Sequence, residues 1–232
     1  MHLRIEIKNA TIVNEGRQFI GTLIIDDDRI DEIIEGANVT PSIPVDETID
    51  GTGCYLLPGV IDDHVHFRDP GLTAKGDFCS ESRAAAAGGV TTVLDMPNCI
   101  PQTTTPEAFD EKWQIAANKS VVNYGFFFGA TAGNAYELSK LNPRKVAGIK
   151  LFMGSSTGNM LVDNEVALRA IFENAKLPIM THCEDSNIIN QNMKVAQEQY
   201  GADPDIAHHA EIRSEEACYQ STSLAVRLAK ET

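Results

Sequence analysis

The chain has 232 residues, of which 43% are hydrophobic and 22% are charged. This is the composition of an ordinary globular protein, so it excludes disordered, collagen-like and coiled-coil chains. Lysine and arginine together number 19 and aspartate and glutamate 33, which leaves a formal net charge of −14. Because the chain lacks a broad positive field, we expect no nucleic-acid partner, and an anionic ligand would have to be bound by a few local cations.

The cysteines and the N-terminal residues predict a cytoplasmic protein. Five cysteines, an odd number without a C-x-x-C pair, argue against a disulfide scaffold or a zinc ribbon, and reduced thiols are typical of the cytoplasm. The first residues alternate apolar and polar side chains, as in a strand rather than a signal peptide. No apolar run approaches the roughly 18 residues of a membrane span, so we expect no membrane partner.

Residues 1–54 predict a small β domain. Leu3, Ile5 and Ile7 alternate with polar residues, and a second apolar run covers 23–25. Three aspartates at 26–28 follow that run and predict a hairpin turn. This part has little apolar mass of its own.

Residues 55–232 have a different pattern, in which apolar strands alternate with helices. Strands are expected at 56–65, 90–94, 121–130, 146–152 and from 178. One helix is expected to end at Ala87 and another to begin at Pro106. Three more are expected over 166–176, 188–199 and 214–230. This alternation predicts an α/β fold with a parallel sheet covered by helices.

The length of this second part leaves two folds open. A complete (β/α)8 barrel takes about 250 residues, whereas residues 55–232 number 178 and carry five expected strands. The chain is therefore either an open sheet or the first part of a barrel, incomplete in this chain. The residues at the strand ends favour the barrel.

Three histidines at strand ends are candidate metal ligands. His64 and His66 stand in Asp62-Asp63-His64-Val65-His66, at the end of the first strand of the second part. Side chains two residues apart share one face of a strand, so both imidazoles could bind one metal ion, although the short motif alone is a weak signal. His182 ends the fifth strand, and barrel sites gather at the carboxyl ends of strands.

Lys150 is a fourth candidate ligand. In Gly148-Ile149-Lys150-Leu151-Phe152, alternation sends Ile149 and Leu151 outward to the helices and Lys150 inward. A buried lysine is costly unless it is neutral, paired or modified. A neutral amine could take up carbon dioxide as a carbamate, which is an anionic ligand able to bridge two metal ions. The alternative is a strand-end lysine that reaches solvent.

Arg68 and Asn98 are candidate substrate-binding residues. Arg68 follows His66 by two positions, and its guanidinium is suited to a bidentate contact with a carboxylate. Asn98 closes the second strand and is able both to donate and to accept hydrogen bonds. A surface ion pair for Arg68 and an Asx-turn for Asn98 are the alternatives.

Three further polar segments are interpreted as ordinary structure. Residues 153–158 lack the ending of a phosphate-binding loop and predict a mobile loop over the site. His208-His209 predict a solvated helix entry. Glu184-Asp185 are interpreted in one of two ways: as residues that contact a metal ligand and orient it, or as a charge pair at a helix start.

Five segments together resemble the dihydroorotases of the amidohydrolase superfamily. They are 58–71, 88–98, 148–152, 181–184 and 213–217, and the first two, ending in Arg68-Asp69-Pro70-Gly71 and Asp95-Met96-Pro97-Asn98, are highly specific in combination. The resemblance extends over nearly the whole chain. It implies a (β/α)8 TIM-like barrel of the metal-dependent hydrolase type over residues 55–232, preceded by a small β-sandwich domain.

The resemblance also implies an activity and a set of roles. The family interconverts L-dihydroorotate and N-carbamoyl-L-aspartate, the ring-closing step of pyrimidine synthesis. His64 and His66 would bind the more buried of two zinc ions, Lys150 would bridge both as its carbamate, and His182 would bind the second. Arg68 and Asn98 would bind the α-carboxylate of the substrate. A homo-oligomer, most simply a dimer, is expected.

Other residues of the family pattern are not found in this chain. The family has a further histidine ligand on the next strand and a proton-shuttling aspartate on the last strand, which we expect beyond Thr232. We therefore expect no catalytic acid–base residue within 1–232 and no activity from this segment alone. Because some bacterial relatives use an aspartate in place of the bridging lysine, Asp163 is an alternative to Lys150.

Other functions stay open. Within the superfamily, allantoinase and dihydropyrimidinase or hydantoinase are the alternatives, and neither requires Arg68 and Asn98 as a joint carboxylate site. A non-catalytic dihydroorotase-like paralogue and a flavodoxin-like binding module are alternatives of another class, but neither needs four ligand residues at separate strand ends.

Overall fold

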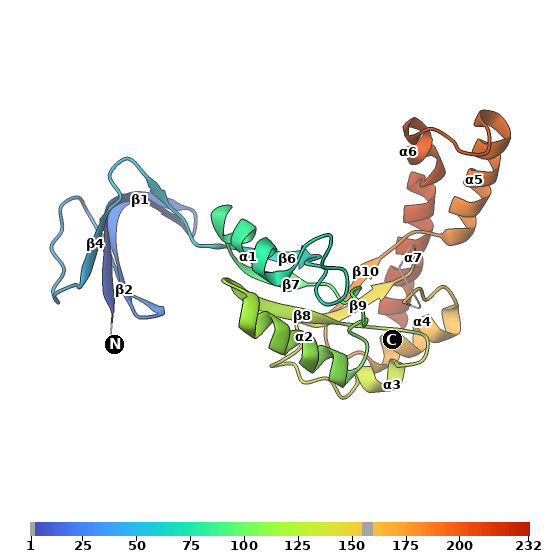
Figure 1. Ribbon diagram of the computed structural model, residues 1–232, viewed down its shortest axis with the longest axis horizontal. Coiled ribbons are helices and arrows are strands. Elements are labelled where there is room, and N and C mark those ends of the chain that lie inside the picture. Colours follow the sequence, from blue (N-terminus) through green and yellow to red (C-terminus); the bar gives the residue numbers. More distant parts are fainter. Residues whose placement is uncertain (1–2, 155–159) are drawn as a thin grey trace. The chain divides into compact units, whose positions relative to one another are not determined.

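The computed structural model describes residues 3–154 and 160–232. The chain divides into two compact units, Met1–Gly59 and Val60–Thr232 (Figure 1). None of the helices within the described ranges is long and apolar enough to cross a membrane.

The first unit is built on a single β-sheet. Its strands are β1 (Arg4–Asn14), β2 (Arg17–Asp26), β3 (Arg29–Glu35), β4 (Glu47–Asp50) and β5 (Tyr55–Leu56). β1, β2 and β3 form antiparallel hairpins, whereas β4 and β5 each pair in parallel with β1. Asp27 turns the chain between β2 and β3 with a φ of 51°, a left-handed conformation that aspartate tolerates. The turn expected at the three aspartates is therefore present.

The first unit is the small β domain that the sequence predicts, and its described residues form one five-stranded sheet. One strand assignment differs from the sequence prediction. Tyr55 and Leu56, which the pattern placed with the barrel, pair with Thr11 and Ile12 of β1. A strand of two residues has no period that could distinguish it from the start of the next strand. The division into functional domains after residue 54 stays a prediction.

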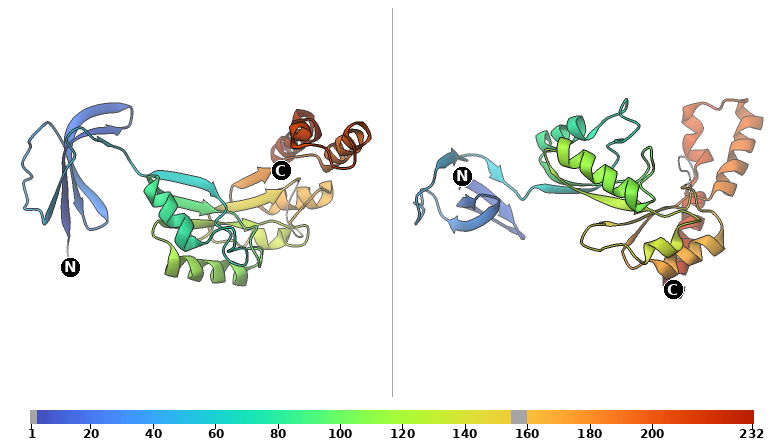
Figure 2. Two further views of the ribbon diagram at one scale, coloured as in Figure 1. Left: turned by 45° about the horizontal axis from the view of Figure 1, so that its top comes forward. Right: turned by 60° about the horizontal axis from the view of Figure 1, so that its bottom comes forward.

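The second unit contains one curled parallel sheet (Figures 1 and 2). Its strands are β6 (Val60–Val65), β7 (Val90–Asp95), β8 (Asn123–Gly129), β9 (Gly148–Phe152) and β10 (Ile179–His182). They lie side by side in chain order, and every neighbouring pair is parallel. β6 and β10 are the two edges of this sheet, and the β6 residues Val60 and Ile61 are 55% and 65% exposed.

Helices follow the strands, and the longer ones begin at side-chain caps. They are α1 (Phe78–Ala87), α2 (Pro106–Lys119), α3 (Ala135–Leu138), α4 (Glu165–Asn174), α5 (Ser186–Tyr200), a 3-10 turn η1 (Ile206–His208), α6 (His209–Ile212) and α7 (Glu215–Glu231). Asp77, Thr105 and Asp185 cap α1, α2 and α5 with their side-chain oxygens, and Pro106 occupies the first turn of α2. α5 and α6 extend away from the sheet (Figure 1).

The core of the second unit lies between the outward face of the sheet and the helices. Val93, Phe126, Phe128, Ile149 and Leu151 are buried there together with helix residues such as those of α1, α2 and α4. The outward orientation predicted for Ile149 and Leu151 is confirmed by their burial in this core. Because side chains alternate along a strand, Lys150 faces the inside of the curved sheet.

Candidate functional site

The candidate ligand residues lie at the carboxyl ends of three strands. His64 belongs to β6 and His66 follows it, Lys150 lies in β9, and His182 is the last residue of β10. In the register of β9 and β10, His182 pairs with Phe152, two residues beyond Lys150, and the two rings have centroids 6.2 Å apart. The sheet is curled (Figure 2), and His64 and His182 lie toward the carboxyl ends of its two edge strands, β6 and β10.

His64 and His66 form a pair whose ring centroids are 5.4 Å apart. His66 Nδ1 lies 2.8 Å from the side-chain oxygen of Asn98, so a neutral His66 that donates from Nδ1 keeps Nε2 for a metal ion. Burial lowers the pKa of His64 and of His66, and the charges of Lys150 and Arg68 respectively act in the same direction. Both imidazoles are therefore favoured in the neutral form that binds metals.

Lys150 is a buried amine, with 1% of its surface exposed. Among the described residues its Nζ has neither a hydrogen bond nor an ion pair. The Nζ lies over the ring of Phe152, 5.0 Å from the ring centroid. Burial lowers the pKa of Lys150, which favours the neutral amine. The alternative of a strand-end lysine reaching solvent does not agree with this burial.

His182 is part of a chain of polar contacts with Glu184 and Arg213. His182 Nε2 lies 2.8 Å from Glu184 Oε2, and Arg213 donates from Nε to Glu184 Oε1 at 2.8 Å and from its terminal nitrogen to Oε2. The Arg213 guanidinium holds the pKa of Glu184 below its ordinary value. Asp185, by contrast, accepts hydrogen bonds from Asn187 and Ile188 as the cap of α5. Glu184 thus contacts a candidate metal ligand, whereas Asp185 has the predicted place at a helix start.

Arg68 and Asn98 do not have the same surroundings. Asn98 bonds to His66, as described above, whereas Arg68 forms no ion pair with an acidic side chain in the described part of the chain. Arg68 is half-buried, and its φ of 67° is uncommon for a residue with a side chain. Strained backbone of this kind is often found at functional sites. The structure thus leaves the Arg68 guanidinium available for a ligand.

A buried ion pair lies at the carboxyl end of β7, beside the segment that contains His66 and Arg68. Lys112 of α2 lies 2.6 Å from Asp95 Oδ2 and donates to the carbonyl of Met96 at 2.7 Å. The other oxygen of Asp95 accepts from the backbone N–H of Phe67, which lies between His66 and Arg68. Sequence reasoning missed this pair. Lys112 stands three residues after Phe109 and four before Ala116, on the apolar face of α2, and that position was the available signal.

Other residues singled out from the sequence lie elsewhere. Asp163 is exposed and lines a small cavity with Asp185 and Gln220. His208 stacks on Tyr200 at the end of the α5–α6 extension, with ring centroids 3.6 Å apart. Of the loop expected at 153–158, residues 155–158 lie outside the described ranges.

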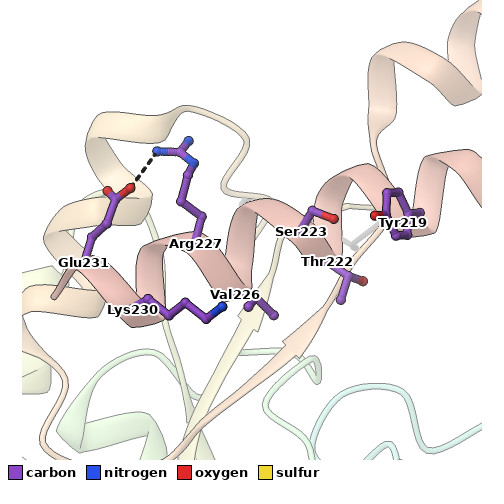
Figure 3. A pocket seen from close by; sticks show the side chains of 7 residues that line it. All are labelled: Tyr219, Thr222, Ser223, Val226, Arg227, Lys230 and Glu231. Carbon is purple, nitrogen blue, oxygen red and sulfur yellow. Dashed lines mark hydrogen bonds and ion pairs between the residues drawn. The ribbon is translucent and has the colours of Figure 1, made fainter.

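A separate hollow lies along α7 (Figure 3). All of the residues that line it belong to this one helix, and they include Tyr219, Val226 and the ion-paired Arg227 and Glu231. Its charged groups are an arginine, a lysine and a glutamate on a helix surface, and no histidine lines it. This hollow is therefore not the site that the strand ends form.

The arrangement at the strand ends is suited to binding cations and an anion. In the described part of the chain, no three His, Cys, Asp or Glu side chains come close enough together to hold one metal ion. His64 and His66 are nevertheless neighbours, and Lys150 and His182 lie on the adjacent strands β9 and β10 of the same sheet. Such a set could bind two metal ions if the amine were converted to an anionic ligand.

Comparison with known proteins identifies relatives along the chain. A family model described as "Dihydro-orotase-like" matches residues 53–201. A dihydroorotase from Methanosarcina acetivorans is 36% identical over 213 residues, covering 90% of this chain and 44% of that protein. An allantoinase from Desulfitobacterium hafniense is 38% identical over 160 residues, covering 66% of this chain and 36% of that protein.

A solved structure of similar fold is an L-hydantoinase (dihydropyrimidinase) from Arthrobacter aurescens. It has a TM-score of 0.89 and 28% sequence identity, over 100% of this chain and 51% of that chain. The chain thus spans less than half the length of the two curated relatives above. This likeness confirms the predicted fold class, of which the chain carries a part.

Proposed function

The chain belongs to the dihydroorotase-like family, and we propose that the whole protein is a zinc-dependent dihydroorotase. This cyclic amidohydrolase would interconvert L-dihydroorotate with water and N-carbamoyl-L-aspartate in pyrimidine synthesis. The observation that carries the proposal is the buried Lys150, which has no polar partner among the described residues and lies in β9, beside the strand that ends at His182. A cytoplasmic location and a dimer stay predictions.

The donor set supports two divalent cations. We expect His64 and His66 to bind one, His182 the other, and Lys150, as its carbamate, to contact both. Each cation would then take at most two histidines from this chain. Carbamate formation would account for the burial of Lys150: the neutral amine would take up carbon dioxide and release a proton, and the resulting anion would be neutralised by the two cations.

When bound, two such cations would polarise the ring amide carbonyl and acidify a water molecule. The residues of this chain would position the substrate. Arg68 supports recognition of the substrate's carboxylate, because its guanidinium is half-buried and has no acidic partner in the described part of the chain. Asn98 would form hydrogen bonds with two groups, the substrate carboxylate and the ring of His66.

Metal analysis and steady-state kinetics test this proposal on the whole protein. We expect about two zinc ions per chain and a kcat/KM for dihydroorotate that exceeds those for allantoin and dihydrouracil. A protein that binds no zinc and turns over none of the three substrates would instead be a non-catalytic paralogue. Such a result would contradict the proposal.

An allantoinase or hydantoinase activity is the second candidate. One observation favours it: Asn98 already bonds to His66, so Arg68 is left as the main group for a carboxylate. An enzyme that does not bind a carboxylate would tolerate the replacement of Arg68. Preference for allantoin or dihydrouracil over dihydroorotate would establish this alternative.

A further inference from the structure

We propose that Arg213 and Glu184 are positioning residues for His182, holding its ring so that Nε2 carries the proton and Nδ1 is left for a metal ion. The part of this inference that concerns metal rests on the proposed function, whereas the part that concerns the tautomer does not. Glu184 and Arg213 are 29 residues apart in the chain, and neither is itself a proposed ligand.

The tautomer follows from the chemistry of the contacts. A carboxylate without a proton only accepts hydrogen bonds. Arg213 donates to both oxygens of Glu184, which stabilises the charged carboxylate. His182 Nε2, 2.8 Å from Glu184 Oε2, must therefore be the donor when the imidazole is neutral. The proton is then on Nε2, and Nδ1 keeps its lone pair.

Arg213 is itself held in place on both sides. The side-chain amide of Asn192, in α5, donates to the carbonyl of Ile212 at 3.1 Å and to the hydroxyl of Ser214 at 3.2 Å. Ile212 is buried, and Ser214 caps the start of α7. Asn192 thus fixes the residues before and after Arg213. We infer that the α5–α6 extension, besides linking β10 to α7, presents this guanidinium to Glu184.

The backbone that carries His182 and Glu184 is also fixed. Met153 at the end of β9 donates its N–H to the carbonyl of His182 at 2.8 Å. Gly154 packs so closely that a Cβ at this position would overlap the carbonyl oxygen of Glu184. Asp185 donates its N–H to the carbonyl of Ala217 in α7 at 2.9 Å. With the backbone held, the contacts of the Glu184 side chain decide the orientation of the imidazole.

A carboxylate that accepts from one ring nitrogen makes the other nitrogen a better metal ligand. It fixes the ring and raises the basicity of the second nitrogen, and loss of such a partner typically lowers metal affinity by about 10–100-fold. Arg213 would act through Glu184, because the planar guanidinium of Arg213 binds both carboxylate oxygens and keeps the carboxylate in one orientation. The effect on zinc should therefore appear although Arg213 does not contact the metal.

The test compares Arg213→Met and Glu184→Ala with a matched control, Arg169→Met, in the whole protein. Arg169 has a similar side-chain exposure, 36% against 30% for Arg213, and forms ion pairs with Glu165 and Glu231. Two quantities are measured: the tautomer of His182, by nitrogen-15 NMR of the metal-free protein at alkaline pH, and the zinc dissociation constant, by competition with a chelator.

We expect His182 to be the Nε2–H tautomer in the wild type and in Arg169→Met, and a mixture of tautomers in the other two variants. Zinc affinity should fall about 10–100-fold in Arg213→Met and Glu184→Ala, and less in Arg213→Lys, which keeps the charge. Thermal unfolding of each metal-free variant distinguishes this local effect from loss of the fold. If Arg213→Met or Glu184→Ala unfolds, the tautomer and the zinc affinity of Arg213→Lys are compared with those of the wild type instead.

The outcomes separate the two proposals. An Nδ1–H tautomer in the wild type, or unchanged tautomer and zinc affinity in Arg213→Met, would overturn the positioning role. A wild-type protein that binds zinc but does not turn over dihydroorotate would overturn the proposed function alone. If the wild type bound no zinc, the tautomer measurement would still decide whether Glu184 and Arg213 position His182.

Discussion

Replacing Lys112 by methionine removes the cation that pairs with the buried Asp95 carboxylate. The Lys112 and Asp95 side chains are 0% and 1% exposed, and Nζ lies 2.6 Å from Oδ2. Methionine has a similar length and keeps the apolar contacts of α2, so the main change is electrostatic. After the replacement, Asp95 would still accept a hydrogen bond from the N–H of Phe67, whereas the carbonyl of Met96 would lose the hydrogen bond from Lys112.

Breaking a buried ion pair on one side typically costs about 3–5 kcal/mol, because the remaining charge is buried without compensation. We expect Lys112→Met to lower the free energy of unfolding of the second unit by that amount. Urea denaturation followed by fluorescence is a suited assay, since the single tryptophan, Trp113, is the next residue in the helix. Adding Asp95→Asn should recover part of the loss, because it removes the uncompensated charge.

Lys140→Met is the matched control. Lys140 pairs with Glu137 at 2.9 Å, but both side chains are about half exposed, and exposed pairs are worth about 0–1 kcal/mol. If Lys112→Met cost no more than Lys140→Met, the pair would not be stabilising the end of β7. The reasoning about burial would then be refuted.

Three further predictions follow from the site and its surroundings. Arg68→Ala should raise KM for dihydroorotate about 10–100-fold, the loss of a charged hydrogen-bonded contact of about 1.5–3 kcal/mol, and should leave KM for the neutral dihydrouracil unchanged in steady-state assays. Gly154→Ala should lower the free energy of unfolding in urea by about 1–3 kcal/mol through overpacking, whereas Gly133→Ala, at a position without neighbours within 4 Å, should have little effect. Lys119 pairs with the buried Asp69 at 2.7 Å, and this contact raises its pKa above 10.5. The stability that the contact supplies is present below pH 10.5 and is lost as pH rises through the raised pKa. Lys119→Met should therefore remove part of the alkaline loss of stability that a pH series of melting temperatures records in the wild type.

Much of the fold could be predicted because local signals agree with the final packing. The alternation around Lys150 correctly assigned Ile149 and Leu151 to the core, since a strand has a fixed period of two. Pro106 and the glycines at 88 and 89 marked a helix start and a helix end by backbone chemistry alone. Strand ends in a parallel sheet meet at one edge, which is why His64 and His182 could be assigned to strand ends from spacing.

The partners of the polar side chains could not be predicted in the same way. Glu184 was recognised as a possible support for His182, but Arg213 lies beyond two helices, and no local pattern relates them. Lys112 and Asp95 likewise meet only when α2 packs on the sheet. Asn98 was assigned to the substrate, because sequence does not show that His66 is within reach of its side-chain oxygen. Such contacts depend on tertiary packing rather than on local period.

Anomalous X-ray diffraction at the zinc edge, from crystals of the zinc-loaded whole protein, tests the proposed metal centre most directly. We predict two anomalous peaks, one in contact with His64 and His66 and the other with His182. Density for a carbamate on Lys150 should join the two peaks. A single peak away from these residues, or an unmodified Lys150 without any metal contact, would contradict the account.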